Sequence, residues 1–138
     1  MHELRTTRRV EFSDTDLAGV VHFSRYFALM ESVEGEFLRA LGADFTLEHE
    51  GARLGWPKAE AACDYVSPAR YGDVLDIHLR VQRKGNRSII YAITFRCGER
   101  EIARGRTVSV CCAAQPGGGF TPIRIPEFLA ALIEQAPA

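Results

Sequence analysis

The sequence contains no long hydrophobic run. Its apolar stretches fall far short of the roughly 20 residues that span a bilayer, and its first residues, MHELRTTRRVEF, lack the apolar segment of a secretory signal peptide. Neither charge predominates, because 17 Lys and Arg against 18 Asp and Glu leave a formal net charge of -1. We therefore expect a cytoplasmic protein that neither crosses a membrane nor binds nucleic acid.

Cysteine is also scarce, and its spacing matches no zinc-site pattern. Of the four cysteines, Cys63 and Cys97 stand alone in strand-like runs, whereas Cys111 and Cys112 are adjacent. Unpaired cysteines are typical of a reducing compartment, and a buried thiol packs like a small apolar side chain. The sequence therefore predicts no bound metal, and we expect the cysteines to be small core residues.

The length and composition are those of one globular domain. The chain has 138 residues, of which 46% are hydrophobic and 25% are charged. A chain of this length can bury a sizeable core without disulfide or metal staples. We expect a single domain over residues 1–138.

One long amphipathic helix is the clearest element in the pattern. Between Phe23 and Leu41 the large apolar residues recur at the i, i+3, i+4, i+7 spacing of a helix with one buried face. Gly42 follows at the position where a glycine commonly ends a helix. Gly35, inside the helix, is unfavourable there, and we expect it to allow close approach of the helix to a sheet.

Most of the remaining chain alternates between apolar and polar residues, which is typical of β-strands. The predicted strands cover residues 4–12, 58–65, 75–82, 89–95 and 101–114. The other predicted segments are one or two helical turns within 44–51, a flexible connection over 115–122 and a terminal helix over 126–136. Consecutive strands joined by tight turns should pair antiparallel, with the long helix packed on the sheet.

These elements predict an α+β fold in which an antiparallel sheet wraps around one long central helix. A sheet covered on one face by one helix leaves its edges and part of the helix unprotected. We therefore expect self-association, as a homodimer or a homotetramer.

The stretch FSDTDLAGVVHFSRYF at residues 12–27 ends a strand, places D-x-D-x-x-G and then enters the helix. Supporting segments are GWP at 55–57, YVSPARYGDVL at 65–75 and RKGNRS at 83–88. Together they resemble the hotdog-fold thioesterases of the 4-hydroxybenzoyl-CoA thioesterase family. The resemblance implies a hotdog fold and hydrolysis of a small-molecule acyl-CoA to an acid and coenzyme A. It implies no cofactor, because coenzyme A is part of the substrate.

The resemblance also implies roles for residues of this motif. The second acid of the pair, Asp16, corresponds to the catalytic carboxylate, which either attacks the thioester or removes a proton from water. The oxyanion donor corresponds to the backbone amide of Phe23 at the helix entrance. Gly19 would let the backbone approach the ligand. Asp14 is implied as a supporting residue, and capping or turn stabilisation is the simplest role for it.

Two further residues remain as candidates with alternatives. His22 either contacts the thioester or faces an interface; the relatives associated with the Tol-Pal operon carry their histidine one position later, where this chain has Phe23. Glu34 lies on the predicted helix, where a solvated face is the default for an acid. A related hotdog branch uses a helix glutamate in catalysis, which makes Glu34 a minor candidate.

Substrate binding is expected at two other segments. In the hairpin RKGNRS, Arg83, Lys84, Arg87 and Ser88 suit the phosphates of coenzyme A, although an ordinary charged hairpin has the same composition. Trp56 corresponds to an acyl-pocket residue that faces the active site of the partner subunit, and packing in the core is the alternative.

Two other functions fit parts of this pattern. A hotdog dehydratase or hydratase of 3-hydroxyacyl thioesters would use a histidine and an acid, but the proline-rich continuation of such enzymes is absent. A non-catalytic acyl-CoA-binding module would need the same pocket without a base, and the retained Asp16 argues against it. The sequence leaves open whether the acyl group is aromatic or aliphatic.

Overall fold

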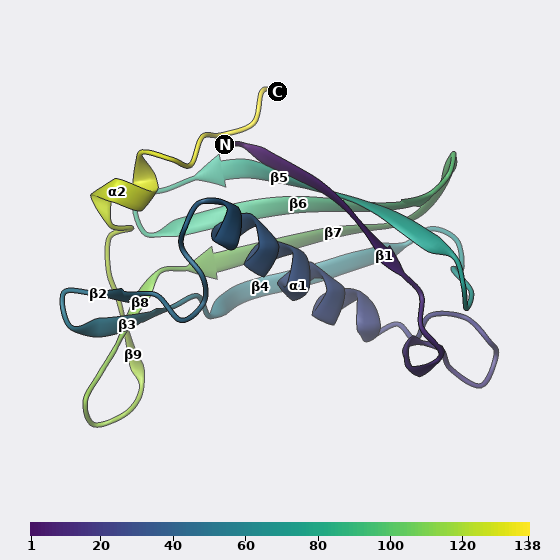
Figure 1. The fold of residues 1–138 in the computed structure, drawn as a ribbon, viewed down its shortest axis with the longest axis horizontal. Helices are drawn as coiled ribbons and strands as arrows, with labels where there is room; N and C mark the ends of the chain where they lie inside the picture. Colours follow the sequence, from purple (N-terminus) through teal and green to yellow (C-terminus); the bar gives the residue numbers. More distant parts are fainter.

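Helix α1 (Arg25–Ala40) lies across one face of a five-stranded antiparallel sheet in the computed structural model, which describes residues 1–138 (Figure 1). The strands follow one another in the order β1 (Glu3–Arg9), β5 (Val74–Lys84), β6 (Ser88–Cys97), β7 (Arg100–Val110) and β4 (Lys58–Tyr65). The predicted α+β architecture, one sheet wrapped around one long helix, is confirmed.

A second, smaller sheet lies at the end of the molecule where α1 finishes (Figure 1). Its strands are β2 (Glu48–His49), β3 (Ala52–Gly55), β8 (Cys112–Ala114) and β9 (Phe120–Pro122). The remaining elements are the single 3-10 turn η1 (Phe12–Asp14) and the short helix α2 (Glu127–Ala130).

The core forms between the buried face of α1 and the inward face of the main sheet. In β5 the alternate residues Leu75, Ile77, Leu79 and Val81 are at most 1% exposed, as the period-two pattern predicts. The helix contributes the other wall, and 24 buried residues form one continuous cluster.

Close packing of the helix on the sheet depends on Gly105 of β7. A Cβ atom there would lie 2.3 Å from the Cε atom of Met30 in α1. The expectation that Gly35 serves this purpose is wrong, because a Cβ on Gly35 would instead meet the ring of Phe45 at 2.8 Å. Gly35 therefore accommodates the segment that follows the helix.

Several elements begin or end at other residues than predicted, because hydrogen-bond partners that are distant in the sequence override the local residue pattern. The first strand ends at Arg9, and α1 spans Arg25–Ala40 within the predicted 23–41. The strand predicted over 101–114 is divided between β7 and β8, so it passes from one sheet to the other. The predicted helical turns within 44–51 and the predicted flexible segment 115–122 instead contain β2 and β9.

The terminal helix is much shorter than the predicted 126–136. The residues after it leave the helix because their amides bond to distant carbonyls: the Glu134 N–H donates to the Met1 carbonyl and the Ala136 N–H to the Val81 carbonyl. The expected antiparallel pairing of β4 with the next strand, β5, is also wrong. β4 pairs with β7, whereas β5 pairs with β1 and β6. The link over residues 66–73 therefore crosses the end of the sheet.

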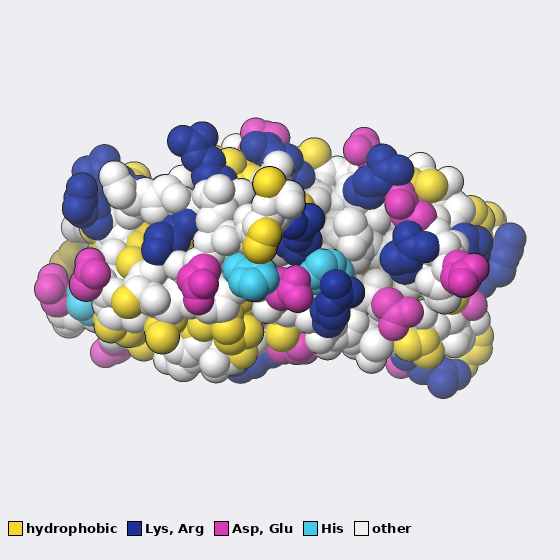
Figure 2. Space-filling model, turned by 90° about the horizontal axis from the view of Figure 1, so that it is seen from above, with side chains coloured by type: hydrophobic (Ala, Val, Ile, Leu, Met, Phe, Trp, Pro, Cys, Tyr) yellow, Lys and Arg dark blue, Asp and Glu magenta, His cyan; other side chains and the backbone are white.

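The two edges of the main sheet differ in character. One edge strand is β1, which pairs only with β5. Figure 2 views the molecule from the side of β5 and the chain termini, where side chains of both charges and histidines are interspersed. The opposite edge, β4, pairs only with β7 and exposes Ala59, Ala61, Ala62 and Tyr65. An exposed edge with small apolar residues is a ready template for pairing with another strand.

No helix in the fold has the length and apolar character to cross a membrane.

Candidate active site

A short hairpin-like loop between β1 and α1 carries Asp16. Thr15 and Val21 form a bridge, and the Asp16 N–H donates to the Val20 carbonyl at 2.8 Å. Gly19 closes the turn with a φ of +81°, and its N–H donates to the Asp16 carbonyl at 2.9 Å. A positive φ is tolerated readily only by glycine, so Gly19 sets the shape of the loop.

The Asp16 carboxylate is oriented through one of its two oxygens. Oδ1 accepts hydrogen bonds from the Ala18 N–H at 2.9 Å and, more weakly, from the Val20 N–H at 3.4 Å. No group of the chain donates to Oδ2 or forms an ion pair with this half-buried side chain. The loop therefore fixes the direction of the carboxylate and leaves one oxygen available.

Asp14, two residues earlier, has a different environment. Oδ2 accepts from the Glu11 N–H at 2.8 Å, and Oδ1 accepts from both Nε and Nη2 of Arg25 at 2.9 Å. The side chain is buried and ties the end of β1 to the first turn of α1. The expected stabilising role of Asp14 is confirmed, and only Asp16 of the two acids has an unpartnered oxygen.

The helix begins two residues after Phe23, at Arg25. The Phe23 N–H donates to no group of the chain, whereas its carbonyl accepts from the Tyr65 hydroxyl at 3.0 Å. A free amide next to a helix N-terminus also feels the positive end of the helix dipole. This amide is consequently a ready donor for a developing negative charge.

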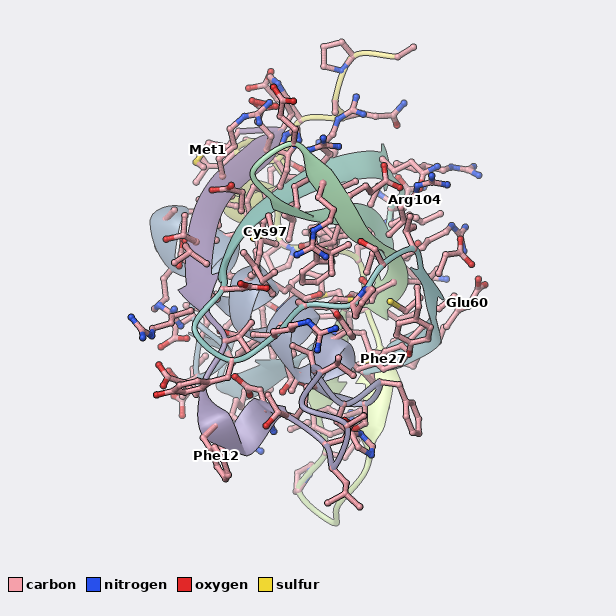
Figure 3. All side chains as sticks on the ribbon, turned by 90° about the vertical axis from the view of Figure 1, so that its right-hand side faces the viewer. Met1, Phe12, Phe27, Glu60, Cys97 and Arg104 are labelled. Atoms are coloured by element: carbon pink, nitrogen blue, oxygen red, sulfur yellow. The ribbon has the colours of Figure 1, made fainter.

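Asp16 and Phe23 line the same cavity, of about 360 Å³, at the end of the molecule that Figure 3 faces. Its walls are largely apolar or aromatic and include Val20, Val21, Tyr26 and Tyr65. Burial raises the pKa of Tyr26 to about 12. Phe12, labelled in Figure 3, projects outward beside this region.

Sequence reasoning missed Tyr26 and Tyr65 as components of this site. Tyr26 fits the apolar helix stripe and was therefore indistinguishable from a core residue, while Tyr65 ends a predicted strand far away in the sequence. An aromatic residue at the end of an alternating run was the one available signal.

His22 lies beside this site without lining the cavity. Its Nδ1 accepts from the Ser24 N–H at 3.2 Å and lies 2.8 Å from the Ser24 hydroxyl, and its ring stacks on Phe23. These contacts hold the residues that precede α1. A catalytic role for His22 stays a prediction.

The basic hairpin between β5 and β6 is at the opposite end of the sheet from the Asp16 loop (Figure 1). Arg83 and Arg87 are exposed there, and Ser88 is the first residue of β6. The Lys84 ammonium, in contrast, donates to the carbonyls of Ala130 and Ile133 at 2.7 and 2.9 Å. Lys84 thus satisfies carbonyls at the end of α2, a structural task that the sequence did not reveal.

Trp56 lies at the same end as this hairpin, between β3 and β4. It is 8% exposed, belongs to the core cluster, and borders a separate cavity of about 300 Å³ together with Phe45, Lys58 and Phe120. Trp56 therefore packs in the core and also borders a cavity. Its role as an acyl-pocket residue stays a prediction. Within one chain, Trp56 and Asp16 belong to different cavities.

Glu34 is not on a solvated face, which corrects the expectation from the sequence. Its side chain is 2% exposed, and its carboxylate pairs with the Lys58 ammonium at 2.9 Å and accepts from the Ser109 hydroxyl at 2.6 Å. Burial raises the pKa of Glu34, although Lys58 and Ser109 act in the opposite direction. Glu34 does not line the cavity that contains Asp16.

Comparisons with known proteins show the family to which the chain is related. The model of the thioesterase-like superfamily matches residues 10–133. A relative from Aquifex aeolicus (strain VF5), named as an esterase, is 39% identical over 110 residues, which cover 80% of this chain and 84% of the relative. A 1,4-dihydroxy-2-naphthoyl-CoA hydrolase from Synechococcus sp. (strain WH7803) is 28% identical over 109 residues, which cover 74% of this chain and 71% of the relative.

A solved structure extends the similarity to three dimensions. A gentisyl-coenzyme A thioesterase superposes with a TM-score of 0.80 and 27% sequence identity. The match covers 95% of this chain and 100% of that one.

Proposed function

The chain belongs to the thioesterase-like superfamily, and from this membership we propose that it hydrolyses an acyl-CoA thioester with Asp16 as the catalytic carboxylate. The membership confirms the resemblance drawn from the D-x-D-x-x-G motif, and the hotdog fold with it. One observation supports the site assignment above the others. The Asp16 carboxylate, with an unpartnered oxygen, and Phe23, with an unpartnered N–H, line one apolar cavity.

Two routes to the products use the same residues. As a general base, Asp16 takes a proton from water, whose oxygen adds to the thioester carbonyl carbon. As a nucleophile, Asp16 adds to that carbon itself, and water then hydrolyses the resulting anhydride. In both routes the carbonyl oxygen becomes negatively charged and accepts from the Phe23 N–H. The C–S bond breaks, and the leaving thiolate of coenzyme A takes up a proton.

We propose an aromatic acyl group with hydroxyl substituents. The named relatives act on 1,4-dihydroxy-2-naphthoyl-CoA and gentisyl-coenzyme A. The rings of Phe23, Tyr26 and Tyr65 border the cavity of Asp16, and aromatic rings pack favourably on one another.

A two-fold dimer formed through β4 would combine the Asp16 cavity of one protomer and the Trp56 cavity of the other in one site. The first residue of β4, Lys58, borders the cavity of Trp56, and its last residue, Tyr65, borders the cavity of Asp16. Antiparallel pairing of β4 with its copy would therefore place Trp56 of one protomer beside Asp16 of the other. A homotetramer built from such dimers satisfies the same argument.

The phosphates of coenzyme A are proposed to bind at Arg83 and Arg87, with Ser88 beside them. Both guanidinium groups are exposed and are free of ion pairs within the chain. Lys84 contributes positive charge while it holds the end of α2. The proposed compartment is the cytoplasm, which suits the four unpaired cysteines.

A thiol-release assay tests the proposed activity. The purified protein is incubated with hydroxyaryl, benzoyl, acetyl and long-chain acyl-CoA, and free coenzyme A is measured with a thiol-reactive dye. An enzyme-only control is needed because the chain has four free cysteines of its own. We expect thiol release that is fastest with the hydroxyaryl substrate.

The other functions give different outcomes in the same assay. A dehydratase would change the absorbance of a 3-hydroxyacyl-CoA without releasing thiol. A binding module would quench tryptophan fluorescence on addition of acyl-CoA and release nothing. Absence of thiol release with every substrate would contradict the proposal.

A further inference from the structure

A partly buried ion pair connects α1 to the segment that carries Trp56. The Lys58 ammonium donates to the Glu34 carboxylate at 2.9 Å and to the backbone carbonyl of Trp56, also at 2.9 Å. The other carboxylate oxygen of Glu34 accepts from the Ser109 hydroxyl of β7 at 2.6 Å. One ammonium group therefore bridges the helix and the Trp56 backbone.

Trp56 needs such a bridge because it sits where the chain passes from one sheet to the other. β3 ends at Gly55 and pairs with β8, whereas β4 begins at Lys58 and pairs with β7. Pro57, between Trp56 and Lys58, has no N–H to donate to a ladder. The Trp56 carbonyl accepts a hydrogen bond from the Lys58 side chain.

Stability alone does not account for this pair. Glu34 is 2% exposed and Lys58 is 25% exposed, so both groups lose much of their hydration. Replacing a buried ion pair with well-packed apolar side chains is often neutral or stabilising. The pair is thus better explained by the position that it imposes on its neighbours.

We propose that Glu34 and Lys58 are positioning residues that hold Trp56 against the acyl group of the substrate. This inference rests on the proposed function, because it takes Trp56 of one protomer to border the acyl group that is held beside Asp16 of the other. Glu34 orients the Lys58 ammonium, and Lys58 fixes the Trp56 carbonyl and with it the direction of the indole ring. Ser109 prevents the carboxylate from rotating away.

The experiment removes the pair without leaving a buried charge. The double variant Glu34→Leu/Lys58→Met is compared with the wild type for hydrolysis of benzoyl-CoA and acetyl-CoA. Trp56 is the only tryptophan in the chain, so acrylamide quenching of its fluorescence reports directly on this junction. We expect kcat/KM for benzoyl-CoA to fall at least about 10-fold, because small misplacements near a substrate have large kinetic effects. The acetyl-CoA rate should fall much less, and quenching should increase.

A second double variant, Arg8→Met/Glu36→Leu, is the matched control. It removes another ion pair between α1 and a strand, with N and O atoms 3.1 Å apart and both side chains partly exposed. Its arginine lies in β1, at the edge of the main sheet opposite to β4. We expect wild-type quenching and a wild-type ratio of benzoyl-CoA to acetyl-CoA activity.

The outcomes separate the inference from the proposed function. Unchanged quenching, or equal losses on both substrates in Glu34→Leu/Lys58→Met, would overturn the positioning role. If the wild type hydrolyses no acyl-CoA, the proposed function fails, and quenching alone then decides whether the pair positions Trp56. Should the apolar double variant fail to fold, Glu34→Gln/Lys58→Gln is measured in the same way.

Discussion

Replacing Asp16 with asparagine is the sharpest perturbation of the proposed site. The amide is nearly isosteric with the carboxylate, and its oxygen can still accept from the N–H groups of Ala18 and Val20, which bond to Oδ1 at 2.9 and 3.4 Å. The amide nitrogen would occupy the position of Oδ2, which has no partner in the chain. We therefore expect Asp16→Asn to fold normally, with a stability change within about 0.5 kcal/mol, as for other substitutions that break no buried contact.

The expected loss of activity is large because the amide can neither attack a thioester nor accept a proton as a base. General acid–base catalysis contributes at least about 100-fold, which corresponds to about 3 kcal/mol of activation free energy. The loss should appear in kcat, since the cavity and the Phe23 amide are unchanged. KM for the acyl-CoA should change little.

The assay combines steady-state thiol release with thermal unfolding, and Asp14→Asn is the matched control. Both oxygens of Asp14 have partners, from the Glu11 N–H and from Arg25. The loss of a buried hydrogen-bond acceptor lowers the free energy of unfolding by about 1 kcal/mol or more, so this control should unfold at a lower temperature. Near wild-type kcat in Asp16→Asn, with intact folding, would refute the catalytic assignment of Asp16.

Four other predictions follow from the same geometry. Arg87→Ala should raise KM for acyl-CoA more than for a truncated pantetheine thioester, because only the former carries the nucleotide phosphates; equal effects would make the hairpin structural. Lys84→Ala should instead lower the unfolding temperature, since the ammonium holds two carbonyls of the α2 segment. Mixing Asp16→Asn protomers with Trp56→Ala protomers should restore part of the activity if hybrid dimers contain one intact site, and a fully active monomer would contradict a shared site. Burial raises the pKa of Tyr26 to about 12 in the folded protein, against about 10 in an unfolded chain. Its contribution to stability is complete below about pH 10 and is lost as the pH rises to about 12, so Tyr26→Phe should flatten the alkaline decline in urea unfolding.

The long elements were predictable because their apolar residues repeat at the period of the structure that they form. The α1 stripe and the alternation in β5 needed no knowledge of the partner surface. The strands of the small sheet were not predictable in this way. β2, β3, β8 and β9 are too short to show a period, and each exists because a distant segment supplies its hydrogen bonds.

The motif around Asp16 was likewise visible in the order of residues, since a strand end, two acids, a glycine and a helix are all local features. The burial of Glu34 and the hydrogen bonds of Lys84 were not visible in the order of residues. Glu34 is buried because β4 supplies Lys58 and β7 supplies Ser109, and Lys84 is engaged because α2 folds over the hairpin.

Local pattern was therefore sufficient for the α+β fold class and the central helix, and the resemblance of a local motif indicated the candidate carboxylate, because these depend on residues that are neighbours in the chain. Only the folded chain decided which groups are free to react. It left one oxygen of Asp16 without a partner, surrounded Asp14 and Glu34 with donors, and brought Tyr65 to the entrance of α1. Those differences arise from contacts between residues far apart in the sequence, whose pairing follows from the packing of the whole sheet around α1.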